Sequence, residues 1–226
     1  MKQTPTDPVM TPEEFAEAAG VSPETLERLR KYDAVLMDWA ERHNLVARST
    51  LPDRWRRHFL DSAQLYRLLP EGTKTIVDLG SGAGFPGLVL AAMGAERGIK
   101  VTLVESTKKK AAFLAGAGRA MGLVNHVVLP ERIESITIFK PDAITARALA
   151  SLAKLAGYAH EIAGKNTICL FLKGQDVEDE LTEASKSWQM DVIKHPSLTS
   201  AGSAILEVRN IAPRGARPGA FKGPRQ

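Results

Sequence analysis

The sequence has a single cysteine and no long apolar run among its 226 residues. One cysteine excludes an internal disulfide, and no spacing of cysteine and histidine resembles a zinc site. A membrane span needs about 20 consecutive apolar residues, which no stretch provides. The segment 1–10 is polar and contains proline, so it lacks the apolar core of a signal peptide. We therefore expect a cytoplasmic protein without a metal site or a membrane partner.

The cysteine, Cys169, lies in the apolar run 168–172. Free cysteine is often buried, so a core position in a strand is favoured over a catalytic nucleophile. Aromatic residues are also few, at 6%. Trp39, Trp55 and Phe59 fall on the apolar faces of expected helices, which favours core packing over stacking on nucleic-acid bases.

Neither sign of charge is in large excess, because the formal net charge is only +4. This mild basic balance permits an anionic partner but does not indicate one. Hydrophobic residues make up 44% of the chain and charged residues 25%, which is typical of a globular protein with a sizeable core.

Four parts are expected along the chain. Residues 1–10 form a flexible tail, residues 11–70 a helical extension, residues 71–210 the main domain, and residues 211–226 a basic flexible tail. Within the extension, Ser22-Pro23-Glu24 predicts a helix start, with a capping hydroxyl, a proline in the first turn and an acid near the positive helix end. A second helix is expected over 55–69.

After residue 70, short apolar runs alternate with helical patterns. The expected helices are 86–97, 107–121 and 151–162, and the expected strands are 75–79, 100–105, 127–129, 142–146, 167–172, 190–193 and 204–209. Strands that alternate with crossover helices predict a mostly parallel α/β sheet with helices on both faces.

A glycine-rich loop joins the first of these strands to the next helix. It contains Gly80, Gly82, Gly84 and Gly87. Glycines allow a sharp turn and let a ligand approach backbone N–H groups at the positive end of a helix. The spacing from Gly82 to Gly87 also matches the fingerprint of dinucleotide-binding proteins. An ordinary tight turn without a ligand is the third interpretation.

Two acids near this loop help to distinguish a dinucleotide from a cofactor with a methionine moiety. Asp78 stands two residues before Gly80, where an acid suits the cationic amino group of a methionine moiety, directly or through water, and suits a pyrophosphate poorly. Asp78 could instead cap a helix. Glu105 ends the second strand, where a carboxylate can accept hydrogen bonds from both ribose hydroxyls, although nicotinamide enzymes use the same device. Together these features favour S-adenosyl-L-methionine over a dinucleotide.

Several segments, spread over residues 13–210, resemble one family closely. The chain is similar to the bacterial 16S ribosomal RNA guanine-N7 methyltransferases, also called glucose-inhibited division protein B. The matching segments are 44–45, 57–62, the loop 78–87 with its Phe85-Pro86-Gly87 ending, 105–106, 109–110, 113–114, 132–134, 147–152 and 173–174. Glu131 and Ile133 depart from the usual small residue and alanine of the family.

The resemblance implies a Rossmann-like class I methyltransferase with a seven-stranded sheet, S-adenosyl-L-methionine as the cofactor, and N7 of one guanine in 16S rRNA as the methyl acceptor. By position, Gly80 and Phe85 would line the methyl donor, Ile133 and Glu134 would contact its adenine end, and Arg147 would lie beside the pocket. Gly82 and Gly84 belong to the same expected donor site.

The chemistry implied by the resemblance needs no general base. Guanine N7 carries an in-plane lone pair and no proton, so proximity and alignment should dominate. Arg147, at the end of a strand, could position guanine, phosphate or the donor, or form a structural salt bridge. Lys173, at the end of the next strand, could contact the RNA backbone and position the substrate.

Further basic residues are candidates for RNA binding. Arg56 and Arg57 belong to a cluster with Arg54 and His58, for which a solvated helix face is equally plausible, while core or surface packing is expected for His58. Arg214 and Arg217 lie in the basic tail, which is either simply flexible or in contact with RNA.

Three other functions remain open: a nicotinamide-dependent oxidoreductase, a non-catalytic RNA-binding module, and a methyltransferase for small molecules. The expected partner is 16S rRNA, within the 30S subunit or an assembly precursor, and a monomer is the default state.

Overall fold

The computed structural model describes residues 8–136 and 140–215. Its centre is a seven-stranded sheet with the order β3-β2-β1-β4-β5-β7-β6. The strands are β1 Thr75–Leu79, β2 Lys100–Val104, β3 His126–Leu129, β4 Ala143–Arg147, β5 Ile168–Lys173, β6 Trp188–Pro196 and β7 Ala204–Pro213. Strands β1 to β5 pair in parallel, and β7 is antiparallel to both β5 and β6. The prediction of a mostly parallel sheet is confirmed.

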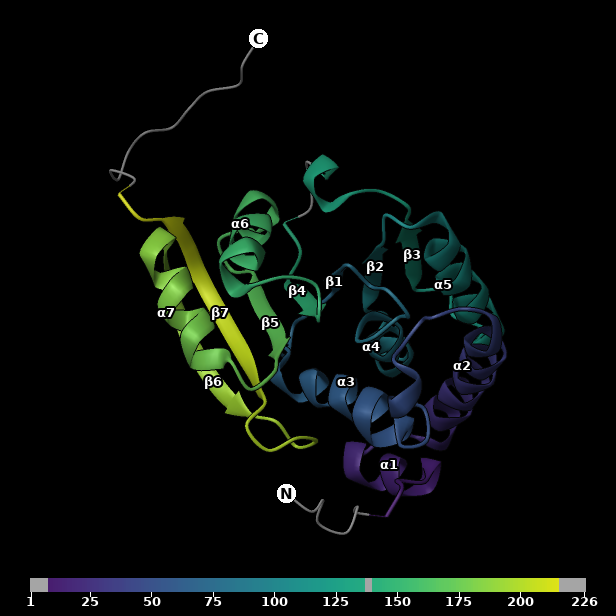
Figure 1. Cartoon of the computed structure of the whole chain (residues 1–226). Helices are drawn as coiled ribbons and strands as arrows, with labels where there is room; N and C mark the ends of the chain where they lie inside the picture. Colours follow the sequence, from purple (N-terminus) through teal and green to yellow (C-terminus); the bar gives the residue numbers. More distant parts are fainter. Residues whose placement is uncertain (1–7, 137–139, 216–226) are drawn as a thin grey trace.

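Both faces of the sheet are apolar because side chains alternate along each strand. In β5, Leu170 and Leu172 pack into one buried cluster with α4 (Gly87–Gly94) and α5 (Lys108–Ala120). Cys169 and Phe171 pack into a second cluster with α6 (Leu152–Ile162) and α7 (Val177–Ser187). Figure 1 shows α6 and α7 beside β7, with α4 and α5 in the other half of the molecule. Cys169 is 1% exposed, which confirms its predicted core position, and this burial raises the pKa of its thiol to about 12.

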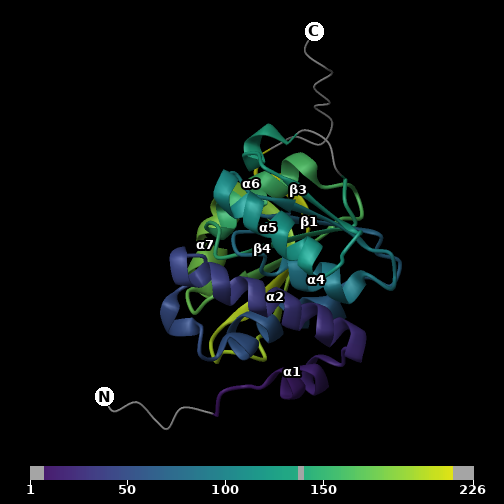
Figure 2. The same cartoon turned by 90° about the vertical axis from the view of Figure 1, so that its right-hand side faces the viewer.

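The N-terminal extension forms α1 (Pro12–Ala19), α2 (Pro23–Arg42) and a bent helical stretch. This stretch contains η1 (Arg48–Thr50), the π-helical η2 (Trp55–Leu60), α3 (Asp61–Ala63) and the 3-10 helix η3 (Gln64–Leu68). The hydroxyl of Ser22 accepts the N–H of Thr25, so the predicted cap of α2 is confirmed. Helix α2 packs on α4 and α5 (Figure 2).

Aromatic side chains of the extension pack into a core that it shares with the main domain. Trp55 and Phe59 are buried and stack with ring centroids 4.2 Å apart, while Trp39 packs at the edge of the same core. Met10 is also buried, and its N–H donates to Asp53. This last residue of the expected tail 1–10 therefore packs against the extension. None of the helices in 8–136 and 140–215 combines the length and apolarity that a membrane crossing requires.

Helix α7 and the strands β6 and β7 differ from the sequence-based expectation. Helix α7 was not expected, because only Val177 and Ala184 are buried on it and so it shows little apolar periodicity. Strands β6 and β7 are longer than expected because they pair with each other along most of their lengths.

Candidate active site

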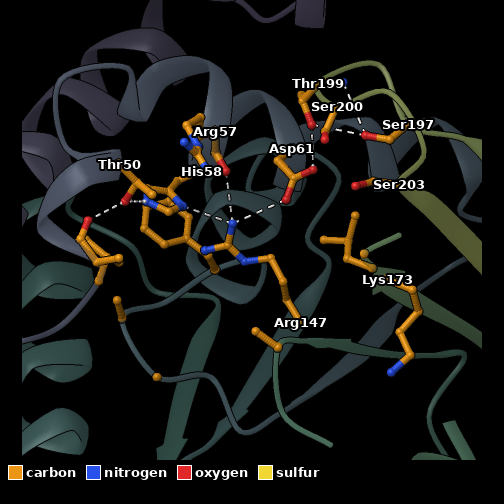
Figure 3. Close-up of a pocket in the computed structure, with 18 of the residues that line it drawn as sticks. Thr50, Arg57, His58, Asp61, Arg147, Lys173, Ser197, Thr199, Ser200 and Ser203 are labelled. Atoms are coloured by element: carbon orange, nitrogen blue, oxygen red, sulfur yellow. Dashed lines mark hydrogen bonds and ion pairs between the residues drawn. The ribbon is translucent and has the colours of Figure 1, made fainter. Parts of the chain in front are cut away.

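A cavity of about 1920 Å³ opens where the C-terminal ends of β4 and β5 meet the extension. Its wall combines the glycine loop, the segment after β4, the end of β5, the bent stretch of the extension and the loop between β6 and β7. Figure 3 shows Arg147 pointing toward His58, Arg57 and Asp61 of the bent stretch, with Thr199 of the loop between β6 and β7 beside Asp61. The ligand-facing edge of such a sheet lies beyond the C-terminal strand ends, so the cavity is the candidate active site.

The glycine loop forms one wall in a conformation that favours glycine. Gly80, Gly82 and Gly84 have φ angles of 64°, 56° and 97°. A Cβ on Gly80 would lie 2.5 Å from Leu149 Cδ1, and a Cβ on Gly84 would lie 2.7 Å from the Tyr32 hydroxyl. Gly80 and Gly82 line the cavity, whereas Gly84 is buried behind it.

The extension holds this loop in place from behind. The buried hydroxyl of Tyr32, on α2, donates a hydrogen bond to the carbonyl of Ala83. Phe85 lies 5.2 Å from the Tyr32 ring and 5.2 Å from the Phe59 ring. The shape of the loop therefore depends on the helical extension as well as on the sheet.

Glu105 lies at the cavity wall, 7% exposed, where the sequence predicted a ligand contact. Its Oε2 accepts the N–H of Gly82 at 3.0 Å, and its Oε1 accepts the N–H of Thr107 at 2.7 Å. Each carboxylate oxygen has two lone pairs, so both retain capacity to accept a ligand hydroxyl. Glu105 thus fixes the glycine loop and offers acceptors to the cavity.

Asp78 is fully buried and is not part of the cavity wall. Its Oδ1 accepts the hydroxyl of Thr145 at 2.7 Å, and its Oδ2 accepts the N–H of Gly87 at the start of α4 at 3.2 Å. Burial raises the pKa of Asp78 to about 6, although the bonds from Thr145, Ser81 and Gly87 act in the opposite direction. This geometry favours the helix-capping alternative over direct contact with a donor.

Arg147 ends β4 and lines the cavity. Its Nη1 donates to the carbonyl of Arg57 at 3.1 Å and to Asp61 Oδ2 at 3.2 Å. Its guanidinium carbon lies 4.9 Å from the centre of the Phe85 ring, close enough for a cation–π contact. Arg147 therefore forms the salt bridge that the sequence left open and also faces the site.

His58 stacks on Phe85 and hydrogen-bonds through both ring nitrogens. Arg147 Nη1 lies 3.0 Å from His58 Nδ1, and an arginine can only donate, so Nδ1 accepts. The proton is then on Nε2, which donates to Thr50 Oγ1 at 2.7 Å. Burial, with the charges of Arg147 and Arg57, lowers the pKa of His58 to about 3.

Asp61, Thr50 and Thr199 are site residues that the sequence did not predict. Asp61 Oδ1 accepts the hydroxyl of Thr199, in the loop between β6 and β7, at 2.8 Å. Asp61 and Thr199 are 138 positions apart in sequence. Only the segment 57–62, which carries part of the family resemblance, gave any signal for this group.

Lys173 also reaches the cavity rim, but its ammonium is engaged. Nζ lies 2.6 Å from Glu180 Oε2 and donates to the carbonyl of Ala150 at 2.8 Å, with the side chain only 7% exposed. These contacts use two of the three donors of the ammonium and give Lys173 a structural ion pair that fixes the segment after β4. The RNA contact of Lys173 stays a prediction.

The basic cluster of the extension divides in the structure. Arg54 pairs with Asp33, and Arg56 contacts Asp53 and the carbonyl of Pro8. Arg56 and Arg57 line the cavity, and Arg57 is exposed. Within 8–136 and 140–215, no acidic side chain pairs with Arg57.

Other predicted site residues lie elsewhere. Ile133 and Glu134, in η4 (Ile133–Ser135), are not part of the cavity wall, and Glu134 accepts the hydroxyl of Tyr158 at 2.7 Å. Arg214 follows the far end of β7, whose first residue pairs with Lys173. At about 3.3 Å per residue, that strand separates Arg214 from the cavity by about 30 Å. Arg217 lies outside the described residues.

Comparison with known proteins identifies the family. The family model described as rRNA small subunit methyltransferase G matches residues 25–210. The chain belongs to this family. It is 50% identical to a ribosomal RNA small subunit methyltransferase G from Rhodospirillum centenum over 206 residues, covering 91% of this chain and 94% of that protein. Identity to the protein of the same description from Paramagnetospirillum magneticum is 47% over 209 residues, covering 92% and 100%.

Solved structures confirm the predicted class of fold. A SAM-dependent methyltransferase from Aquifex aeolicus superposes with a TM-score of 0.54 at 18% identity, covering 70% of this chain and 94% of that one. A ribosomal protein L11 methylase from Lactobacillus delbrueckii gives a TM-score of 0.54 at 16% identity, covering 68% and 78%. The seven-stranded sheet is thus a Rossmann-like class I methyltransferase fold. The family match does not favour the nicotinamide oxidoreductase alternative.

Proposed function

We propose that this protein transfers a methyl group from S-adenosyl-L-methionine to N7 of one guanine in 16S rRNA. The observation that carries the proposal is the family match over residues 25–210, which spans the glycine loop and all of the cavity wall except Pro8 and Val9. We further propose that the protein is a cytoplasmic monomer that acts on the 30S subunit or an assembly precursor. A protein of 24.5 kDa has little surface with which to hold a large RNA in its folded form.

The residues of the cavity suit the methyl donor. Gly80 and Gly82 bring backbone to the wall with no Cβ in the way, and Glu105 supplies buried carboxylate oxygens beside them. We assign Gly80, Gly82, Phe85 and Glu105 to the donor. When bound, S-adenosyl-L-methionine supplies a methyl group activated by a positively charged sulfur.

The proposed reaction is one displacement in which the methyl carbon–sulfur bond breaks as the carbon–N7 bond forms. The N7 lone pair makes the new bond, the sulfur keeps the electron pair of the old one, and the positive charge moves to the purine. No proton is transferred, so no general base is assigned. The protein contributes alignment of the two reactants, worth up to about 7–11 kcal/mol in favourable cases.

The proposal is tested with purified protein, labelled methyl donor, and small subunits from cells that lack the gene. We expect label in 7-methylguanine at one position of 16S rRNA, and none on free nucleosides. Label on free nucleosides alone would support a small-molecule methyltransferase. Binding of RNA without any transfer would support a non-catalytic RNA-binding protein.

Glu105→Gln should weaken donor binding by about tenfold to a hundredfold, the usual value of a hydrogen bond to a charged group. The amide replaces one acceptor oxygen with a donor, so it repels the N–H of Gly82 or of Thr107. Titration calorimetry measures the loss. Glu134→Gln is the matched control, because Glu134 lies outside the cavity wall. An equal loss of donor affinity in the two variants would show that Glu134 contacts the adenine end of the donor.

Arg57→Ala should reduce the salt dependence of RNA binding. An exposed arginine that neutralises one phosphate contributes about 0.7–0.9 to the slope of log affinity against log salt. Filter binding of the small subunit at several salt concentrations measures the slope. Arg42→Ala is the control, since Arg42 is exposed but outside the main cavity. An unchanged slope for Arg57→Ala would remove this residue from the RNA interface.

A further inference from the structure

One nitrogen of Arg147 carries all of its hydrogen bonds to protein atoms. Nη1 carries two hydrogens and faces three acceptors, so one N–H is shared: the acceptors are the carbonyl of Arg57, His58 Nδ1 and Asp61 Oδ2 (Figure 3). Nε and Nη2 have no hydrogen-bond partner in the part of the chain that the structure describes, and the side chain is 17% exposed at the cavity wall. The guanidinium is thus held by one corner and by the Phe85 ring, with its other N–H groups available.

Asp61 is itself fixed on both sides. Its Oδ1 accepts from Thr199 at 2.8 Å and from Gln64 Nε2 at 3.0 Å, which leaves Oδ2 for Arg147. The side chains of Asp61 and Arg147 are each 17% exposed. This carboxylate therefore joins the extension and the loop between β6 and β7 to the guanidinium.

His58 fixes the guanidinium from another direction. The hydrogen bond from Nε2 to Thr50, which in turn donates to the carbonyl of Ala47 at 2.6 Å, holds the tautomer whose Nδ1 accepts from Arg147. A lowered pKa keeps this ring neutral, so Asp61 is the charged group that pairs with Arg147 at this corner.

The proposed reaction makes particular demands on an arginine at this place. Guanine presents O6 and N7 side by side as acceptors, and a bidentate arginine would occupy the N7 lone pair that must attack. Because Nη1 is already saturated, guanine can reach only Nη2 or Nε. Methylation also makes the purine cationic, so an unpaired guanidinium beside it would oppose the reaction by like-charge repulsion.

We propose that Asp61 and His58 are positioning residues, which hold Arg147 so that it binds guanine O6, leaves N7 open and adds no net positive charge to the site. This inference rests on the proposed function. It assigns roles to two residues that act through Arg147 rather than by touching the reacting atoms.

The test compares Asp61→Asn with Asp33→Asn. Asp33 pairs with Arg54 and has a similarly buried side chain in the same extension, but it does not line the cavity. For Asp61→Asn we expect kcat to fall about tenfold to a hundredfold, while KM for small subunits and calorimetric affinity for S-adenosyl-L-methionine stay within about threefold. For Asp33→Asn we expect a lower urea midpoint and kcat within about twofold.

A double-variant cycle shows whether Asp61 acts through Arg147. Asp61→Asn should cost nothing further in an Arg147→Met background. A kcat unchanged by Asp61→Asn, or a full additive loss in the double variant, would overturn the inference. A wild-type protein that transfers no methyl group to small subunits would instead overturn the proposed function.

A second pair of variants keeps the inference testable if Asp61→Asn does not fold. The amide oxygen of asparagine can take the place of His58 Nδ1, whereas that of glutamine reaches further, toward the Nε2 position. His58→Asn should therefore lose several-fold less kcat than His58→Gln. The reverse order, or equal losses, would contradict the assigned role of Nδ1.

Discussion

Replacing Gly80 with alanine is expected to lower the affinity for S-adenosyl-L-methionine by about a hundredfold. The new Cβ would lie 2.5 Å from Leu149 Cδ1, and both residues line the cavity. Leu149 is only half-buried, so its side chain can move, and the open space is on the cavity side. To avoid the new Cβ, the Leu149 side chain would therefore move into the space that the donor needs. Titration calorimetry with the donor measures the loss.

Gly98→Ala is the matched control for this variant. Gly98 has a φ of 66°, close to the 64° of Gly80, and a Cβ there meets nothing within 4 Å. Both alanines pay about 1–2 kcal/mol for the left-handed backbone, offset in part by a stiffer unfolded chain. Both variants should therefore lose about 1 kcal/mol of unfolding free energy. Equal donor affinity in the two variants would show that the volume beside Gly80 is not used by the donor.

The sequence could predict the part of the site whose residues lie close together in the chain. A strand, a glycine loop and a helix follow one another in the chain, so local patterns were sufficient to place Gly80, Gly82 and Glu105 at one edge of the sheet. The same patterns predicted the parallel strands β1 to β5, whose sequences are apolar runs, and shorter versions of the antiparallel β6 and β7. Helix α7 carries too few buried residues to show such a pattern.

The group around Arg147 could not be predicted in this way. Asp61 lies 86 positions from Arg147, and Thr199 lies 138 positions from Asp61. Their contacts arise only when the extension folds over the strand ends and the loop between β6 and β7 closes from the other side. The sequence indicated an arginine at the right strand end, but only the packing of three distant segments decides what holds it.

Asp78 is a different case, because its position was predicted and its environment was not. In β1, Val77 and Leu79 pack toward α6, so the alternation of the strand directs Asp78 to the opposite face, where α4 begins. A Cβ on Gly87 would lie 2.6 Å from Asp78 Oδ2. The glycine that the sequence associated with ligand binding thus lets the helix start reach a buried carboxylate.

This burial predicts a specific pH dependence of stability. The carboxyl of Asp78 loses its proton near its usual pKa of 3.8 in the unfolded chain but only near 6 in the folded protein, because burial disfavours its charge. Between these values the folded state binds the extra proton, so this group makes the unfolding free energy fall as pH rises from about 4 to about 6, and adds no slope above that. Two pKa units correspond to about 2–3 kcal/mol.

Asp78→Asn should remove this slope. The deficit of the variant relative to wild type should be about 2–3 kcal/mol smaller at pH 7 than at pH 4, measured by urea unfolding at each pH. Asp142→Asn is the contrasting control. Partial burial alone would raise the pKa of Asp142, but hydrogen bonds from Lys74 and Thr75 lower it, so its contribution is present above pH 4 and lost only below it.

The same Asp78 variant decides between the two roles considered for this acid. A carboxylate that caps α4 from the interior can be replaced by an amide with a change of only a few-fold in donor affinity. If Asp78→Asn lost as much affinity as Gly80→Ala, the acid would have to reach the donor's amino group in the bound state, and the loop would have to open toward β1. A parallel pH profile for wild type and variant would show that the carboxyl is less buried in solution than its fully enclosed position implies.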